Sequence, residues 1–254
     1  MNPQLTTQLR HLRLSGMAEA MPLRLEQTKS AGLEPLEFLE LLVQDELTRR
    51  ADRLFARRLK QAGIIKIKEL SDFDWSFNRK IPRRVLIDLA TAGFVAEHRH
   101  ALLIGPPGTG KTHAVTAITV GAIRAGYRAL IRQVFDLAQD FAEAEAIGER
   151  RAFVKKLCAA DLLALEDFGM KRLGPAAAED LLEVFVRRHE VGSILVTTNR
   201  PTEDWGKFLG DTPAATAILD RFLAHAEIVR MDGKSYRLHA RVRENSAAQA
   251  AGND

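Results

Sequence analysis

Gly105-Pro106-Pro107-Gly108-Thr109-Gly110-Lys111-Thr112 fits the pattern G-x-x-x-x-G-K-[ST] at every fixed position. An apolar run at 101–104 predicts a short buried strand that enters this stretch, and a helical pattern at about 112–124 predicts a helix that leaves it. Glycines let the backbone bend tightly, so that successive N–H groups and a helix N-terminus face an anion. Lys111 can then reach the β- and γ-phosphates, and the Thr112 hydroxyl can ligate Mg²⁺. The stretch therefore predicts that the protein binds a nucleoside triphosphate.

A pair of acidic residues, Glu166 and Asp167, directly follows an apolar strand predicted at 162–165. A triphosphate site of this kind needs one carboxylate to hold Mg²⁺ and another to orient or deprotonate the attacking water. Position assigns Glu166 to the metal and Asp167 to the water. The usual order is aspartate and then glutamate, so each side chain here differs in length by one methylene. Because displacements of that size affect in-line attack, we expect nucleotide binding with slow hydrolysis.

Two further side chains are candidates for the chemistry at the terminal phosphate. Asn199 follows an apolar strand predicted at 193–198, where its amide can hydrogen-bond the γ-phosphate or the attacking water. An asparagine there can equally cap a turn. Arg221 lies in a predicted helix, and its guanidinium can reach a phosphate in its own subunit or in a neighbouring one. A surface ion pair of the Asp220–Arg187 type is the alternative, and spacing alone does not decide between them.

Strand and helix patterns alternate along the second part of the chain, which predicts a largely parallel sheet with helices on both faces. Ligands of such sheets bind beyond the carboxyl ends of the strands, where the phosphate loop, the acidic pair and Asn199 all fall. The first part of the chain has only helical periodicity. The predicted organisation is a helical N-terminal domain at 1–66, a connecting segment with a short helix at 67–98, an α/β nucleotide-binding domain at 99–240 and a disordered tail at 241–254.

Basic residues are concentrated before the phosphate loop. Between residues 49 and 84 there are twelve basic and four acidic residues. Half of the basic ones lie late in a helix predicted at 35–61, namely Arg49, Arg50, Arg53, Arg57, Arg58 and Lys60. Spacings of three and four residues place Arg50, Arg53 and Arg57 on one face of that helix. Such a row is either a solvated helix face or a stripe that contacts DNA phosphates, and the charges alone leave both interpretations open.

An aromatic segment, Phe73-Asp74-Trp75-Ser76-Phe77, lies in the connecting stretch. Aromatic rings in a DNA-binding protein can stack on bases, or they can pack one domain against another. We favour the second interpretation, in which the segment packs the helical domain against the main domain.

The composition is that of an ordinary globular protein, with 254 residues, 46% hydrophobic and 28% charged. One cysteine, Cys158, excludes a disulfide framework and argues against zinc sites, and its partly apolar surroundings predict an inert thiol. No apolar run reaches the length of a membrane span, and the start lacks a signal segment. We therefore expect a cytoplasmic protein without a membrane partner.

Taken together, these residues resemble the IstB-like transposition helpers, AAA+ ATPases that are encoded beside a transposase in bacterial insertion sequences. The resemblance extends over nearly the whole chain and includes the phosphate loop and the acidic pair. It also includes Lys68-Glu69-Leu70-Ser71-Asp72-Phe73-Asp74 and Thr198-Asn199-Arg200-Pro201. The combination of these with two C-terminal stretches, Ile218-Leu219-Asp220-Arg221 and Gly233-Lys234-Ser235-Tyr236-Arg237, is much more specific than the phosphate loop.

The resemblance implies an AAA+ P-loop NTPase fold with a truncated lid domain, and ATP with Mg²⁺ as its cofactors. It implies that Asn199 is the sensor-1 residue and that Arg221 is an arginine finger acting in trans within a ring or spiral of identical subunits. It also implies that the oligomer assembles on double-stranded DNA, deforms it, and recruits and stimulates a cognate transposase. Two alternatives remain, namely a helicase loader of the DnaC type and a nucleotide-gated DNA scaffold with little hydrolysis.

Overall fold

The computed structural model of the chain describes residues 3–209 and 212–239. It divides into two compact units, Met1–Arg58 and Leu59–Asp254. The division falls inside helix α3 (Pro35–Ala62), before the boundary at residue 66 that the sequence suggested. The tail predicted at 241–254 lies outside the described residues.

The first unit is helical, as predicted, and consists of α1 (Pro3–His11), α2 (Ser15–Ala31) and the greater part of α3. Acidic residues of α3 hold the start of α2. The buried Glu46 carboxylate accepts a hydrogen bond of 2.6 Å from the backbone amide of Gly16, so it satisfies an amide that the first turn of α2 leaves unpaired. Further along, Arg24 forms a two-pronged ion pair with Asp45, at 2.7 and 2.8 Å.

A five-stranded parallel sheet forms the centre of the second unit, with the order β2-β3-β4-β1-β5. The strands are β1 (His100–Ile104), β2 (Ala129–Gln133), β3 (Leu162–Phe168), β4 (Ser193–Thr198) and β5 (Ala226–Arg230). The four strands that the sequence predicts, at 101–104, 128–131, 162–165 and 193–198, are confirmed. β5 was not predicted, because it is an edge strand that is largely exposed and lacks an apolar run.

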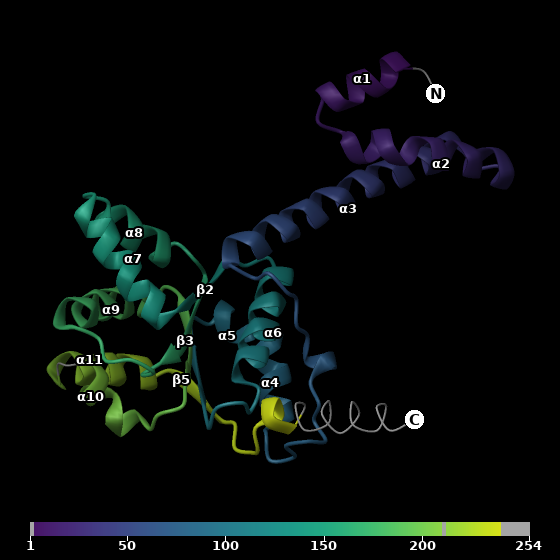
Figure 1. The fold of residues 1–254 in the computed structure, drawn as a ribbon. Helices are drawn as coiled ribbons and strands as arrows, with labels where there is room; N and C mark the ends of the chain where they lie inside the picture. The colour runs from purple at the N-terminus through teal and green to yellow at the C-terminus, as the bar shows by residue number, and fades with distance from the viewer. Residues whose placement is uncertain (1–2, 210–211, 240–254) are drawn as a thin grey trace, which may run out of the picture. The chain divides into compact units, whose positions relative to one another are not determined.

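Helices cover both faces of this sheet (Figure 1). On one face lie α4 (Arg83–Ala90), α5 (Gly93–Ala96) and α6 (Lys111–Arg124), and on the other lie α7 (Val134–Ala146), α8 (Arg150–Cys158), α9 (Pro175–Arg188), α10 (Trp205–Leu209) and α11 (Thr212–Leu223). Two single turns, η1 (Leu70–Asp72) and η2 (Thr202–Asp204), lie in the connections. α6 is buried along most of its length because it lies between the sheet and α4.

The larger part of the core lies between the sheet and the group α7–α11. Aromatic rings of Phe168, Phe185, Trp205 and Phe222 pack against one another there, and all four side chains are buried. None of the helices in the described ranges combines the length and the hydropathy that a membrane crossing requires. The Cys158 thiol is half-buried, and burial raises its pKa, in keeping with an inert thiol.

Candidate nucleotide-binding site

The phosphate loop connects β1 to α6, as the sequence predicted. Gly108 and Gly110 adopt left-handed backbone, with φ of 81° and 99°, which residues with a side chain rarely adopt. Lys111 is the first residue of α6, and its ammonium donates hydrogen bonds of 2.7 Å to the Gly105 carbonyl and 2.8 Å to the Pro106 carbonyl. Burial lowers the pKa of Lys111, while the charge of Asp167 opposes this shift. The loop therefore holds its cation in place by its own carbonyl groups.

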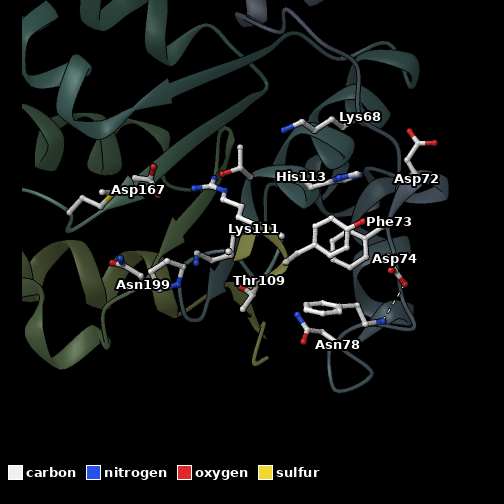
Figure 2. A pocket seen from close by; sticks show the side chains of 18 residues that line it. Lys68, Asp72, Phe73, Asp74, Asn78, Thr109, Lys111, His113, Asp167 and Asn199 are labelled. Atoms are coloured by element: carbon white, nitrogen blue, oxygen red, sulfur yellow. Dashed lines mark hydrogen bonds between the residues drawn. The ribbon is translucent and has the colours of Figure 1, made fainter. Parts of the chain in front are cut away.

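A cavity of about 370 Å³ lies over this loop. Figure 2 shows Lys111 in its middle, Asp167 and Asn199 on one side, and Phe73 and Asn78 on the other. The cavity is lined by Lys68, Asp72, Phe73, Asp74, Phe77, Asn78, residues 107–113, Asp167, Met170, Asn199, Tyr236 and Arg237. It thus has a polar side with an acid and an amide, and an aromatic side.

The two acids lie within β3, whereas the sequence predicted a strand that ends before them. Leu165 pairs with Val196 and Phe168 pairs with Thr198, so Glu166 and Asp167 together oppose the single residue Thr197. This is a β-bulge, and Asp167 has a φ of 55° in it. In a regular strand, neighbouring side chains point to opposite faces. The bulge removes that alternation, so that Asp167 lines the cavity while Glu166 stays close to Thr112.

The Glu166 carboxylate is buried, with 5% of the residue exposed. Gln133 donates a hydrogen bond of 3.1 Å to Oε2, whereas Oε1 has no partner among the described residues. Burial raises the pKa of Glu166 to about 7; the charge of Asp167 adds to this rise, and the Thr112 hydroxyl opposes it. A buried carboxylate oxygen without a donor, next to the Thr112 hydroxyl, fits a divalent cation.

Asn199 directly follows β4, and its side chain lines the cavity. Arg221 lies in α11, is exposed, and is not among the residues that line the cavity of its own chain. The ion pair between Arg187 and Asp220 that the sequence suggested as an alternative is not present among the described residues, since Arg187 pairs with Glu183 at 2.7 Å.

The aromatic segment at 73–77 lines this site. The sequence predicted instead that the segment packs the helical domain against the main domain, and that prediction does not explain its contacts with the phosphate loop. The Phe73 ring lies against Gly110 of the phosphate loop and makes an edge contact with the His113 ring at 5.3 Å. Phe77 makes an edge contact with Tyr236, also at 5.3 Å. Sequence reasoning did not place these side chains at the nucleotide site, although Phe73 and Tyr236 fall in stretches that carried the resemblance.

The basic residues of α3 do not form a uniform row. Three of them have partners within the helical unit. Arg49 pairs with Glu19 at 2.6 Å, Arg50 pairs with Glu46 at 2.7 Å, and Arg53 donates a hydrogen bond of 2.7 Å to the Ser15 hydroxyl. The other three, Arg57, Arg58 and Lys60, are exposed or half-exposed near the end of the helix. Part of the predicted DNA stripe therefore connects α3 to its neighbouring helices.

A parallel sheet with this strand order, a phosphate loop after β1 and an acidic pair in β3 define a P-loop NTPase with the AAA+ fold. Solved structures with the same fold include the DnaC helicase loader, with a TM-score of 0.51 at 20% identity over 68% of this chain and 98% of that one. DnaA from Aquifex aeolicus bound to AMPPCP gives a TM-score of 0.55 at 20% identity, over 65% of this chain and 50% of that one.

Residues 7–244 match the family of IstB-like ATP-binding proteins, and the chain belongs to that family. It is 34% identical over 235 residues to an ATP-binding protein of insertion sequence IS21 from Pseudomonas aeruginosa, covering 92% of this chain and 89% of that protein. It is also 34% identical over 242 residues to an insertion-sequence ATP-binding protein from Mycobacterium tuberculosis, covering 93% and 94%.

Proposed function

We propose that this protein is an ATP-hydrolysing, DNA-binding helper of a transposase. The observation that carries the proposal is the convergence of Lys111, Thr112, Asp167 and Asn199 on one cavity from three separate strand ends, with Glu166 next to Thr112. These are the side chains that bind a triphosphate, hold its metal and position a water molecule. The names of its relatives, as ATP-binding proteins of insertion sequences, supply the biological setting.

Binding begins at the phosphate loop. The Lys111 ammonium exchanges its carbonyl partners at Gly105 and Pro106 for phosphate oxygens, and the N-terminus of α6 faces the same anion. The Phe73, Phe77 and Tyr236 rings give the other end of the cavity an apolar wall suited to a purine base. The described residues contain no group of three or more acidic, histidine or cysteine side chains that could hold a metal alone. Thr112 and Glu166 would therefore hold Mg²⁺ together with the phosphates, where the cation neutralises developing charge.

Hydrolysis needs a water molecule in line with the terminal phosphate. Asp167 lines the cavity from β3 and would accept a proton from that water, while the Asn199 amide would hydrogen-bond the water or the γ-phosphate. Arg221 is exposed on α11, away from the cavity of its own chain, which favours a contact with the nucleotide of a neighbouring subunit. The proposal therefore includes a ring or spiral of identical subunits.

DNA binding would use the basic residues late in α3, which read phosphate charge and duplex shape rather than base edges. In this proposal, ATP drives assembly on double-stranded DNA, the assembled oligomer deforms the duplex, and the deformed site recruits and stimulates the cognate transposase.

The test is ATP turnover and particle size measured without DNA, with single strands and with duplex. We expect duplex to stimulate turnover and to give large assemblies, whereas preference for single strands would favour a helicase loader. Assembly on duplex with ATP bound but not turned over would favour a scaffold. Lys111→Ala should lose ATP binding, and Asp167→Asn should keep binding and lose turnover by about 100-fold or more. Retained ATP binding in Lys111→Ala would contradict the assignment of the phosphate loop.

The arginine finger has its own test. Arg221→Ala should bind ATP normally and lose stimulated turnover. A mixture of Arg221→Ala with Asp167→Asn, which keeps ATP binding and therefore assembly, should recover part of the turnover, because a subunit of the first variant beside one of the second then meets an intact Arg221. No recovery at any mixing ratio would argue for a role within one subunit.

A further inference from the structure

A segment near the end of the described chain, residues 231–239, runs along the phosphate loop, and we call it the C-terminal strap. The Met231 amide donates a hydrogen bond of 2.8 Å to the Ile104 carbonyl, where β1 enters the loop. The Tyr236 amide donates one of 2.9 Å to the Gly108 carbonyl in the middle of the loop. Backbone contacts thus hold the strap against the site that carries the phosphates.

Asn78 attaches this strap to the connecting segment on the other side of the cavity. Its amide nitrogen donates to the Lys234 carbonyl and its amide oxygen accepts from the Lys234 backbone N–H, both at 2.9 Å. A side-chain amide donates and accepts side by side, as a peptide group does, so Asn78 pairs with one residue of the strap as a neighbouring strand would. Asn78 is buried, and a Cβ on Gly233 would come within 2.3 Å of it, so the approach requires glycine at 233.

The strap carries Arg237 into the cavity. Arg237 lines the cavity together with Lys111 and Asp167. Across residues 3–209 and 212–239, no hydrogen bond or ion pair holds its guanidinium. Its charge lowers the pKa of both Lys111 and Glu166, so its positive potential reaches the place where the phosphates and their metal would lie. A cation with no protein partner in an anion-binding cavity is available to a ligand.

We propose that Asn78 is a positioning residue for the nucleotide: it fixes the strap so that Arg237 contacts the triphosphate. This inference rests on the proposed ATP binding. The strap residues 231–235 belong to no helix or strand, and between the backbone contacts of Met231 and Tyr236 the Asn78 amide is bonded to Lys234 on both sides; without Asn78, more of the ordering of Arg237 would fall to the binding of the nucleotide. Holding it beforehand removes that entropic cost from binding. Asn78 itself does not touch the phosphates in this arrangement and acts through Arg237.

The experiment is a double-mutant cycle on the full chain, read as the dissociation constant of Mg·ATP by titration calorimetry. Arg237→Gln should weaken binding about tenfold or more, because a charge-assisted contact to phosphate is lost. Asn78→Leu should weaken it to a similar extent in the parent chain and by less than about twofold in the Arg237→Gln background. Equal losses in both backgrounds would overturn the proposal, since Asn78 would then act only through general stability.

A second variant changes the strap residue that packs against Asn78. Gly233→Ala should displace Asn78 and reproduce the loss of Asn78→Leu, again only when Arg237 is present. Arg84→Gln, an exposed arginine of α4, is the matched control for a lost charge and should bind Mg·ATP as the parent does. If Lys111→Ala abolishes binding while Asn78→Leu and Gly233→Ala keep the parent affinity, this inference fails and the proposed function stands. If Lys111→Ala binds normally, the proposed function itself fails.

Discussion

The backbone amide of Asp167 donates a hydrogen bond of 3.0 Å to Oγ1 of Thr197 on the neighbouring strand. Asp167 has a φ of 55° at this point, and aspartate tolerates left-handed backbone better than glutamate does. Thr197 stands opposite both acids of β3, so its hydroxyl takes the place of a regular ladder partner. The unusual order, glutamate and then aspartate, therefore has a physical reason: the second position has left-handed backbone, which aspartate adopts more readily than glutamate.

Thr197→Val tests whether this contact positions the carboxylate of Asp167, which we propose to be catalytic. The change keeps the shape of a side chain that is 1% exposed and removes the acceptor for the Asp167 amide. Because a partly buried amide then lacks a partner, we expect the free energy of unfolding to fall by about 1 kcal/mol. We also expect ATP turnover to fall by roughly tenfold with little change in ATP affinity, since Lys111 and the phosphate loop are untouched.

The matched control is Thr119→Val in α6. Thr119 is equally buried, but its hydroxyl has no partner among the described residues. Replacing an unpaired buried hydroxyl with a methyl group should leave the free energy of unfolding unchanged or raise it by up to about 1 kcal/mol. If both variants lose the same stability and turnover, the Thr197 hydroxyl has no special role.

Much of the fold followed from local sequence. The phosphate loop has a fixed spacing, and the apolar runs at β1, β3 and β4 are buried on both sides, so each is visible without tertiary information. β5 escaped prediction because an edge strand with exposed Glu227 and Ile228 has no such run. The bulge at Asp167 also escaped, since it depends on the register between two strands.

The contacts of Asn78 and Arg237 depend on chain segments that are far apart in sequence. Asn78 meets Lys234 across 156 residues, and nothing in the local sequence of either segment indicates the pairing. The difference between the arginines in the middle and at the end of α3 likewise depends on contacts between distant segments. A helical wheel places Arg50, Arg53 and Arg57 together, but only the tertiary packing reveals that Arg50 also bonds the Arg13 carbonyl and that Arg53 bonds the Ser15 hydroxyl.

Salt dependence of DNA binding can show whether the basic residues at the end of α3, rather than those in its middle, contact DNA. Arg57→Gln with Lys60→Gln should lower the slope of log K against log salt by roughly 1–2, as expected for one or two lost phosphate contacts. Arg49→Gln with Arg53→Gln removes the same charge, but also removes contacts to Glu19 and Ser15. That pair should lower the melting temperature and change the slope less. Equal changes of slope would assign the whole row to DNA, and no change would make it a solvated helix face.

Arg188 is a completely buried arginine, and the groups around it are backbone carbonyls. Its guanidinium donates hydrogen bonds to the carbonyls of Leu157 at 2.8 Å, Ala160 at 2.7 Å and Ser193 at 2.6 Å. It thereby pairs carbonyl groups at the end of α8 and at the start of β4. Arg188→Met would leave these carbonyls buried without donors, and chemical denaturation should show a loss of about 3 kcal/mol or more.

The neighbouring Arg187 provides the control for this variant. Its side chain is 60% exposed and pairs with Glu183 on the helix surface. Arg187→Met should therefore change the free energy of unfolding by less than about 1 kcal/mol. A small loss in both variants would mean that the carbonyls find other donors when the guanidinium at residue 188 is removed.

His100 should make the protein sensitive to acid. Its ring is 2% exposed, and Nδ1 accepts a hydrogen bond of 3.2 Å from the Ile194 amide. Burial, followed by the charge of Arg188, lowers the pKa of His100 from 6.5 to about 4. The His100 ring therefore binds a proton below about pH 6.5 in the unfolded chain, but only below about pH 4 in the folded chain. The free energy of unfolding consequently falls as the pH decreases from 6.5 to 4, by about 3 kcal/mol in all. His100→Asn keeps an acceptor for the Ile194 amide and should remove that part of the decline in the free energy of unfolding, measured by denaturant titrations between pH 7 and 4.

His98→Asn is the control, because residue 98 is exposed and has a φ of 53° that asparagine tolerates. This variant should keep the decline of the parent chain. An unchanged decline in His100→Asn would assign the acid sensitivity to other groups.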